Sequence, residues 1–246
     1  MAIYPWARWM PIRTNTGGPR AWTRAVVLHV DAGGADSLYG WFNNPSALAS
    51  SHFYVRYDGI VEQYVDTDTV AWTQRQGNAS CLGIETQGVG SGSWTENQLR
   101  SLASLVSWLC YQYHLPITDM RTSHPDAQGV GLHRYGNAPW RVAGGEVWGP
   151  QGKVCPGDAR VAQFPSLLAR ARAVAPPPRR RRVEDEMPMI YRAGGERTPY
   201  GILSANGGWV ELRTKEEYDN LKRAGVKEVW VERLTLNNLI ADSRAR

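Results

Sequence analysis

A short segment rich in proline and arginine divides the chain and limits how it can fold. Residues 175–188 contain three consecutive prolines, four consecutive arginines and then an acidic run. Prolines stiffen such a segment, and a block of like charges resists collapse into an apolar core. We therefore predict a linker at 175–188, with a large domain over 1–174 and a small module over 189–246.

Apolar runs in the large domain predict buried strands. One run covers residues 25–30, and another covers residues 82–87. Residues 51–65 contain two strand-like stretches on either side of the turn Tyr57-Asp58-Gly59, a pattern typical of a β-hairpin. Four strands are therefore expected before residue 90.

Two helices are also predicted in this domain. Thr95 and Gln98 form a capping box, with Thr at the N-cap and Gln three positions later, and the apolar spacing then continues to about Tyr113. A last helix is expected to start near residues 164–165 and to end near Val174. Mixed strands with helices favour an α/β fold, in which a central mixed β-sheet is flanked by helices and functional residues lie on strand ends and loops.

The composition indicates an anionic binding partner but does not identify it. The formal charge is +5, and 11 tryptophans accompany only 3 phenylalanines. A basic chain suits an anionic partner such as nucleic acid, a membrane surface or an anionic cell wall. Tryptophan and tyrosine line carbohydrate and peptide grooves well, although many simply belong to the core.

The three cysteines do not suggest a disulfide framework. Their number is odd and they show no short-range pairing, so Cys81 and Cys110 are expected to be buried thiols. The first residues lack a long apolar stretch, and no 18-residue apolar span follows. We therefore expect no secretory signal, no membrane span and folding in a reducing cytosol.

Two histidines and the third cysteine form a candidate metal site. His29 follows the apolar run 25–28, and Cys155 lies in the Gly- and Pro-containing loop 152–157. Together with His133 they make a ligand set that is typical of zinc with an open fourth position. An open position indicates a metal-bound water and hydrolytic chemistry. His124 is a nearby rival to His133 for the second place.

Short motifs follow one another in a fixed order across residues 25–160. They are Val27-Leu28-His29, Ser51-His52-Phe53-Tyr54-Val55, Asp58-Gly59, Glu62-Gln63-Tyr64-Val65, Ala71-Trp72, Leu82-Gly83-Ile84-Glu85, Trp94-Thr95, Gly131-Leu132-His133 and Lys153-Val154-Cys155-Pro156-Gly157. As an ordered set they resemble the zinc-dependent N-acetylmuramoyl-L-alanine amidases, the type 2 family that is related to animal peptidoglycan recognition proteins. Each motif alone is weak, whereas the ordered set is specific.

The resemblance implies roles that elementary chemistry also supports. His29, His133 and Cys155 would hold Zn²⁺. Glu85 follows apolar residues in a predicted strand, where an unpaired carboxylate is costly, and beside the metal it could take a proton from water and pass it to the leaving amine. If the loop is extended, Lys153 shares a side with Cys155 and lies near the developing oxyanion.

Each of these residues also has an ordinary structural explanation when taken alone. A histidine at a strand end is usually structural, Cys155 could be a buried thiol, and Glu85 could belong to an ion pair. Lys153 could be a solvated loop lysine. The joint order of the motifs favours the zinc site, and the hydrophobic residue before His133 favours it over His124.

Two departures from the family pattern stand out. Cys155 follows His133 by 22 positions, which indicates an inserted loop, whereas many relatives place these residues closer together. Trp140 and Trp148 in this loop either grip substrate or pack within the loop. In addition, Ser51 stands where some members carry tyrosine, which shifts the acid–base role toward Glu85.

The candidate substrate contacts are four aromatic residues. They are His52, Trp72, Trp140 and Trp148, of which His52 could instead be a core residue or lie behind the metal ligands. His114, at the end of the long helix, is expected to be exposed.

The leading hypothesis is a phage endolysin-like zinc amidase acting on bacterial peptidoglycan. It would cut the amide between N-acetylmuramic acid and L-alanine of the stem peptide, and would wait in the host cytoplasm until lysis releases it to the wall. The alternatives are a peptidoglycan recognition module without activity and a virion-associated lytic protein. Glu85, Lys153 and Cys155 together favour the enzyme.

The linker and the C-terminal module carry weaker predictions. Residues 179–182 could bind anionic wall polymers or could be a solvated linker, and no motif supports specific DNA binding. Strands are expected at 189–192, 200–203, 209–212 and 228–231, with a turn at Asn206-Gly207 and a helix at 215–223. Such an α+β module resembles the small C-terminal modules of actinobacteriophage lysins. It could bind the cell wall, form oligomers or attach to a phage tail.

Overall fold

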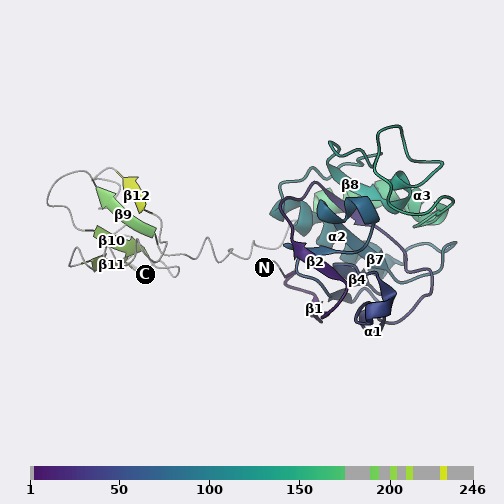
Figure 1. The fold of residues 1–246 in the computed structure, drawn as a ribbon, viewed down its shortest axis with the longest axis horizontal. Coiled ribbons are helices and arrows are strands. Elements are labelled where there is room, and N and C mark those ends of the chain that lie inside the picture. Colours follow the sequence, from purple (N-terminus) through teal and green to yellow (C-terminus); the bar gives the residue numbers. More distant parts are fainter. Residues whose placement is uncertain (1–2, 175–188, 194–199, 204–208, 213–227, 232–246) are drawn as a thin grey trace. The chain divides into compact units, whose positions relative to one another are not determined.

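The structure is a computed structural model that describes residues 3–174, 189–193, 200–203, 209–212 and 228–231. The chain separates into two compact units, Met1–Arg179 and Arg180–Arg246 (Figure 1). The predicted linker at 175–188 lies outside the described residues. In the part of the chain that is described, no helix is both long and apolar enough to cross a membrane.

The first unit contains eight strands, three α-helices and three short 3₁₀ helices among its described residues. In chain order they are β1 (Arg8–Trp9), β2 (Thr16–Pro19), β3 (Ala25–Leu28), α1 (Tyr39–Phe42), η1 (Pro45–Ala47), β4 (Phe53–Val55), β5 (Val61–Gln63), β6 (Thr69–Ala71), η2 (Arg75–Ala79), β7 (Cys81–Thr86), α2 (Glu96–Gln112), β8 (Gly129–Leu132), η3 (His133–Gly136) and α3 (Asp158–Ala173). Helices and strands alternate along the chain, as the α/β prediction requires.

Six of these strands form the central mixed sheet, in the order β1-β5-β4-β7-β3-β8. The neighbours β4, β7, β3 and β8 run parallel to one another, whereas β5 is antiparallel to β4. A second sheet of two strands joins β2 to β6. The predicted α/β fold with a mixed central sheet is therefore confirmed.

One face of the central sheet is covered by helices α2 and α3. Strand residues Leu28, Ile84 and Leu132 belong to the same fully buried cluster as Leu102 of α2 and Leu167 of α3. Side chains alternate between the two faces of a strand, so these residues define the face that turns toward the helices. This face contains the main apolar core of the unit.

The other face of the sheet is packed differently. Ala25 and Val27 of β3 belong to a separate buried cluster that also contains Cys81, Met120 and Trp148. We call this surface of the sheet the loop-covered face, because Trp148 comes from the loop between His133 and Cys155. Residues at alternate positions of β3, β7 and β8 lie on it.

The predicted hairpin and capping box are confirmed. Strands β4 and β5 pair as an antiparallel hairpin, and Gly59 in the turn has φ of +86°, a left-handed conformation that glycine tolerates. At the start of α2 the Thr95 side chain accepts from the Gln98 N–H, while the Gln98 side chain accepts from the Thr95 N–H. This helix ends where the sequence predicts, with Tyr113 as its C-cap.

The last helix begins earlier than the sequence predicts. Helix α3 starts at Asp158 and passes through Pro165, which was expected to mark its beginning. Pro165 is exposed, so the Val161 carbonyl that loses its helical partner can be hydrated. The buried stripe of Phe164 and Leu167 continues across the proline and fastens the helix to the sheet.

The second unit contains a four-stranded sheet among its described residues. Its strands are β9 (Met189–Ala193), β10 (Tyr200–Leu203), β11 (Trp209–Leu212) and β12 (Glu228–Val231), in the order β11-β10-β9-β12. All four lie where strands were predicted. The turn predicted at Asn206-Gly207 and the helix predicted at 215–223 lie outside the described residues.

Candidate functional site

Three neighbouring parallel strands, β7, β3 and β8, place three site residues side by side. In the register of the sheet, Leu28 pairs with Ile84 on one side and with Leu132 on the other. The next residues along the three strands are His29, Glu85 and His133. Since Leu28, Ile84 and Leu132 face the helices, alternation turns the following residues to the loop-covered face.

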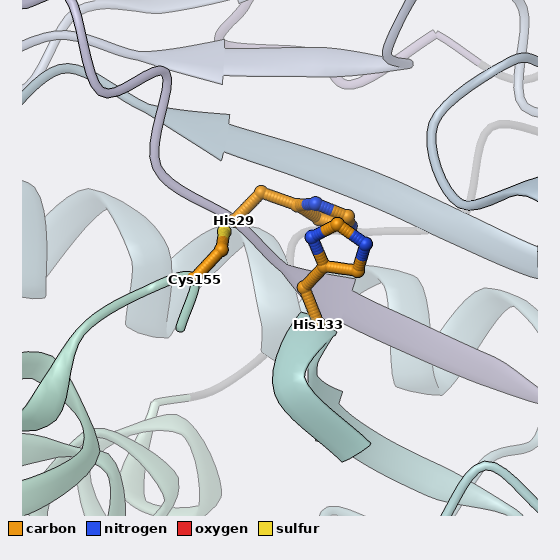
Figure 2. A group of neighbouring side chains, drawn as sticks. All are labelled: His29, His133 and Cys155. Atoms are coloured by element: carbon orange, nitrogen blue, oxygen red, sulfur yellow. The ribbon is translucent and has the colours of Figure 1, made fainter. Parts of the chain in front are cut away.

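The loop before α3 adds a cysteine to this row. His29, His133 and Cys155 each offer a ligand atom, and these atoms all lie within 4.8 Å of one another. Figure 2 shows the three side chains converging from the end of a strand, from the turn after another strand and from a loop. The two imidazole rings are 4.2 Å apart between centroids. The sequence-predicted trio is thus brought together, with His133 as its second histidine.

Both histidines are buried and neutral. Burial is the main cause that lowers the pKa of His29 well below 6.5, with His133 and Lys153 adding to the effect. Burial likewise lowers the pKa of His133 to about 4. Neutral imidazole is the form that binds a metal, because its bare nitrogen carries a free lone pair.

Each histidine also keeps one buried nitrogen without a protein partner. His29 Nε2 and His133 Nδ1 make no hydrogen bond within the described residues. An unsatisfied buried polar atom is costly, and two of them beside a thiol are unusual for a purely structural cluster. Two imidazole nitrogens and one sulfur are a ligand set that zinc prefers, so the residues present fit this metal.

The surroundings of Cys155 favour metal binding by its sulfur. The Val30 backbone N–H donates to Cys155 Sγ at 3.3 Å. Burial is the main cause that raises the pKa of the thiol to about 12. A buried thiol with so high a pKa stays protonated unless a cation compensates the thiolate charge, which again fits a metal at this position.

Two arginines fasten the segment that carries Cys155. Arg134, directly after His133, donates to the Val154 carbonyl at 3.3 Å and pairs with Asp158 at 2.6 Å. Arg160 is fully buried and donates to the Pro156 carbonyl at 3.1 Å. The cysteine is therefore fixed by α3 and by the turn that holds the second histidine.

Glu85 lies beside the histidines with an unusual ionisation. Its Oε1 is 3.7 Å from His29 Nδ1, and its Oε2 is a buried oxygen with no partner in the described part of the chain. Burial first and the charge of Asp31 second raise the pKa of Glu85 to about 8, while Lys153 opposes the shift. Since His29 is neutral, the contact between the two side chains is not an ion pair at neutral pH.

Lys153 lies on the solvent side of the cluster. It is exposed and lines the cleft above the ligands. Its charge lowers the pKa of both His29 and His133 and also that of Glu85, so its ammonium is electrostatically coupled to each of them. The position is suited to an anion that develops in the cleft.

The cluster forms the floor of a cleft made of two adjoining cavities. Their volumes are about 410 Å³ and about 520 Å³, and both are lined by Ala49, Trp72, Thr73, His133 and Lys153. Trp72, predicted as a substrate contact, therefore lies in the cleft wall. The larger cavity extends toward Arg75 and Pro150, and the smaller one toward Trp41 and Asp31.

Trp41 and Asp31 were missed by the sequence analysis. Trp41 is 56% exposed and comes from the short helix α1, whose tryptophan carries no spacing signal of its own. Asp31 accepts hydrogen bonds from the Gly34, Ala35 and Gly88 backbone amides and from the Tyr54 hydroxyl. The sequence offered one indication of Asp31. It follows His29 by two residues, at a strand end that was already assigned to the site.

The prediction that His52 contacts substrate is wrong. His52 is fully buried, and its Nδ1 accepts from the Gly83 N–H while its Nε2 bonds the Thr69 carbonyl. The ring therefore joins the hairpin to β7 and has no free edge. The core alternative raised from the sequence is the one observed.

The insertion between the second histidine and the cysteine packs on the domain. Trp148 is only 1% exposed, so the prediction that its indole grips substrate is wrong. Trp140 is half-buried, with the Arg134 guanidinium 4.3 Å from its ring centroid. His124 lies outside the ligand cluster, where its partly exposed ring faces Asp126 at 3.5 Å.

The remaining sequence-predicted side chains lie as expected. Cys81 and Cys110 are free, buried thiols. His114 is exposed at the end of α2.

Comparison with known proteins gives a consistent set of relatives. Residues 19–158 match the family described as N-acetylmuramoyl-L-alanine amidase. N-acetylmuramoyl-L-alanine amidase A of Achromobacter lyticus is 33% identical over 91 residues, which are 36% of this chain and 51% of that protein. The chain thus spans about half the length of this curated relative.

Solved structures with a similar arrangement include enzymes and recognition proteins. N-acetylmuramoyl-L-alanine amidase LysC from Clostridium intestinale is 18% identical with a TM-score of 0.46, covering 67% of this chain and 97% of that one. Drosophila peptidoglycan recognition protein SD is 15% identical with a TM-score of 0.44, covering 64% of this chain and 93% of that one.

Proposed function

The chain belongs to the N-acetylmuramoyl-L-alanine amidase family, and from that premise we propose that it is a zinc-dependent peptidoglycan amidase. It hydrolyses the amide between the lactyl group of N-acetylmuramic acid and the L-alanine of the stem peptide. One observation carries this proposal: the ligand atoms of His29, His133 and Cys155 lie within 4.8 Å of one another, beside Glu85, whose Oε2 is buried without a hydrogen-bond partner in the described residues. A zinc ion bound by these ligands lowers the pKa of a water molecule toward neutrality.

Glu85 moves the protons of the reaction. The water oxygen forms a bond to the lactyl carbonyl carbon, and the carboxylate of Glu85 accepts the proton that the water loses. The same carboxyl then gives this proton to the alanine nitrogen as the carbon–nitrogen bond breaks, which leaves a lactyl carboxyl group and an amine. The second proton of the water leaves the new carboxyl group, and the products at neutral pH are a carboxylate and an ammonium group. A pKa of about 8 without metal, lowered when a cation lies nearby, is suited to both steps near neutral pH.

Lys153 and the cleft walls position the substrate. The ammonium of Lys153 faces the cleft and stabilises the negative charge that develops on the carbonyl oxygen. Trp41 and Trp72 offer aromatic faces on which a sugar ring or an apolar stem residue can lie. The two adjoining cavities leave room for the sugar on one side of the ligands and for the stem peptide on the other.

The biological setting we propose is that of a phage endolysin. The enzyme is held in the host cytoplasm until lysis and then acts on the cell wall. The basic linker at 175–188 and the C-terminal module add affinity for anionic wall polymers or peptidoglycan.

The proposal is tested by digesting purified actinobacterial cell walls and identifying the new chain ends. We expect free L-alanine amino groups without new reducing sugars, and we expect chelator or Cys155→Ser to abolish their release. New reducing ends alone, or activity indifferent to both treatments, would contradict the proposal. Wall binding without cleavage would favour the recognition-protein alternative.

A further inference from the structure

The loop between His133 and Cys155 contacts the second histidine on the side away from the other ligands. His133 Nε2 lies 3.1 Å from the Trp148 carbonyl oxygen, and the ring is 3% exposed. A carbonyl can only accept, so the hydrogen of this neutral imidazole is on Nε2. Nδ1 is then the nitrogen with a free lone pair, and it is the nitrogen that has no partner among the described residues.

The Trp148 carbonyl is itself fixed by the packing of its residue. The Trp148 N–H donates to the Gly136 carbonyl at 2.9 Å, which ties the loop to the turn that carries His133. A Cβ placed on Gly136 would lie 2.3 Å from Trp148 Cγ, so the indole lies directly against this turn. Since the indole is buried, moving the carbonyl would require moving the whole side chain out of the core.

An ion pair between the fully buried Arg24 and the partly buried Glu146 contacts the indole in turn. Trp148 Nε1 donates to Glu146 Oε2 at 2.9 Å, and the same oxygen accepts from Arg24 at 2.6 Å. Arg24 is fully buried and also donates to Ser80 Oγ and to the His124 carbonyl. Arg24 directly precedes β3, so the chain of contacts runs from the strand that carries His29 to the ring of His133.

We propose that Arg24, Glu146 and Trp148 are positioning residues that set the tautomer and the ring orientation of His133. The insertion therefore supports the metal ligand rather than gripping substrate. Hydrogen-bond partners behind a ligating histidine fix which nitrogen faces the metal and change metal affinity by about 10–100-fold. The inference rests on the proposed zinc site, but it does not depend on the substrate or on the reaction.

The first measurement is the tautomer of His133 in the metal-free protein. Nitrogen-15 NMR of labelled histidine distinguishes a protonated from an unprotonated ring nitrogen. We expect a protonated Nε2 and a bare Nδ1 in the wild type, and a mixture of tautomers in Trp148→Ala. A wild type with the proton on Nδ1 would overturn the proposal, whether or not the protein binds zinc.

The second measurement is the zinc dissociation constant, by competition with a chromophoric chelator. We expect Trp148→Ala and Glu146→Ala to weaken zinc binding about 10–100-fold. Glu146→Gln keeps an acceptor oxygen and should recover most of the loss, whereas Glu146→Met, which keeps a side chain of similar length without an oxygen, should not. Unchanged dissociation constants in both alanine variants would overturn the proposal.

Two controls separate positioning from stability. Val142→Ala changes an exposed residue of the same loop, and Val106→Ala opens a cavity on the helix-covered face. Both should bind zinc like the wild type, although Val106→Ala should melt at a lower temperature. If Val106→Ala weakens zinc binding as much as Glu146→Ala, the network is only structural. A wild type that binds no zinc would contradict the proposed function, while the tautomer still decides the present inference.

Discussion

The two faces of the central sheet bury different kinds of side chain. On the helix-covered face, Leu28, Ile84 and Leu132 pack against apolar residues of α2 and α3. One residue further along each strand, His29, Glu85 and His133 turn to the loop-covered face, and each keeps a buried polar atom without a partner. The first row stabilises the fold, whereas the second row carries a cost that a bound ligand can relieve. Stability and function should therefore respond to different substitutions.

The largest effect is expected from Glu85→Gln, which changes only the loop-covered face. The amide cannot take a proton from water, so activity on cell walls should fall by about 10²–10⁴-fold while zinc is still bound. Activity can be followed by release of L-alanine amino groups and zinc content by elemental analysis. Glu96→Gln, an exposed position at the start of α2, is the matched control and should remain active. Equal activity in both variants would remove Glu85 from the mechanism.

The opposite behaviour is expected from Leu102→Ala on the helix-covered face. Leu102 is fully buried in the main core, so its truncation should lower the free energy of unfolding by about 2–5 kcal/mol. The kcat/KM of the folded protein should stay close to that of the wild type. Urea unfolding and a cell-wall assay at low temperature measure the two quantities. A loss of activity in the fully folded variant would show that the faces are coupled.

An effect of intermediate size is expected for the pH dependence of stability in the metal-free protein, and it should come from the loop-covered face alone. Folding raises the pKa of Glu85 to about 8 from an ordinary value of 4.5, so the folded state prefers the protonated carboxyl. This contribution is complete below pH 4.5 and is lost as the pH rises through 8. Between pH 6.5 and 8 this carboxyl alone should reduce the free energy of unfolding by up to about 1.4 kcal/mol per pH unit. The buried histidines, which still titrate in the unfolded state near pH 6.5, act in the opposite direction.

The measurement is denaturant unfolding of the metal-free protein at several pH values between 6.5 and 8. The histidines contribute equally to the wild type and to Glu85→Gln, so the variant should lack only the part of the pH dependence that Glu85 causes. Parallel pH dependences in the wild type and the variant would show that Glu85 is ionised in the folded protein.

The smallest effect is expected at the rim of the loop-covered face. Trp41 lines the cleft and is 56% exposed, so Trp41→Ala should raise KM for wall fragments by about tenfold, with kcat little changed. Trp22 is 52% exposed and does not line either cavity, so Trp22→Ala is the matched control. Similar KM values in the two variants would argue against a substrate contact at Trp41.

The strand ends could be predicted from the sequence because they depend on local patterns. An apolar run followed by a polar residue indicates the end of a buried strand, and this placed His29 correctly, directly after β3. Glu85 lies inside β7, as the predicted strand at 82–87 implies. The capping box at Thr95 is equally local. The order of β7, β3 and β8 in the sheet does not follow from local patterns. That His29, Glu85 and His133 lie side by side could therefore be predicted only from the ordered family motifs, and the structure confirms it.

The failures concern residues whose surroundings come from distant parts of the chain. Trp148 is buried because Gly77 and Gly136 leave room for its indole, which no pattern around residue 148 reveals. His52 has no free edge because Gly83 and Thr69 occupy both nitrogens. The start of α3 was misjudged because a proline inside a helix is tolerated on an exposed face, and exposure is a tertiary property.

The register of the three strands has a consequence for when the molecule becomes active. A slip of one residue in β3, β7 or β8 would turn that strand's site residue to the helix-covered face. The ligand set therefore exists only after β8, the last of the three to be synthesised, has paired with β3. Shortened or mispaired chains have no second histidine beside His29 and so lack the proposed zinc site. Pairing of β8 with β3 is therefore a condition for the proposed activity.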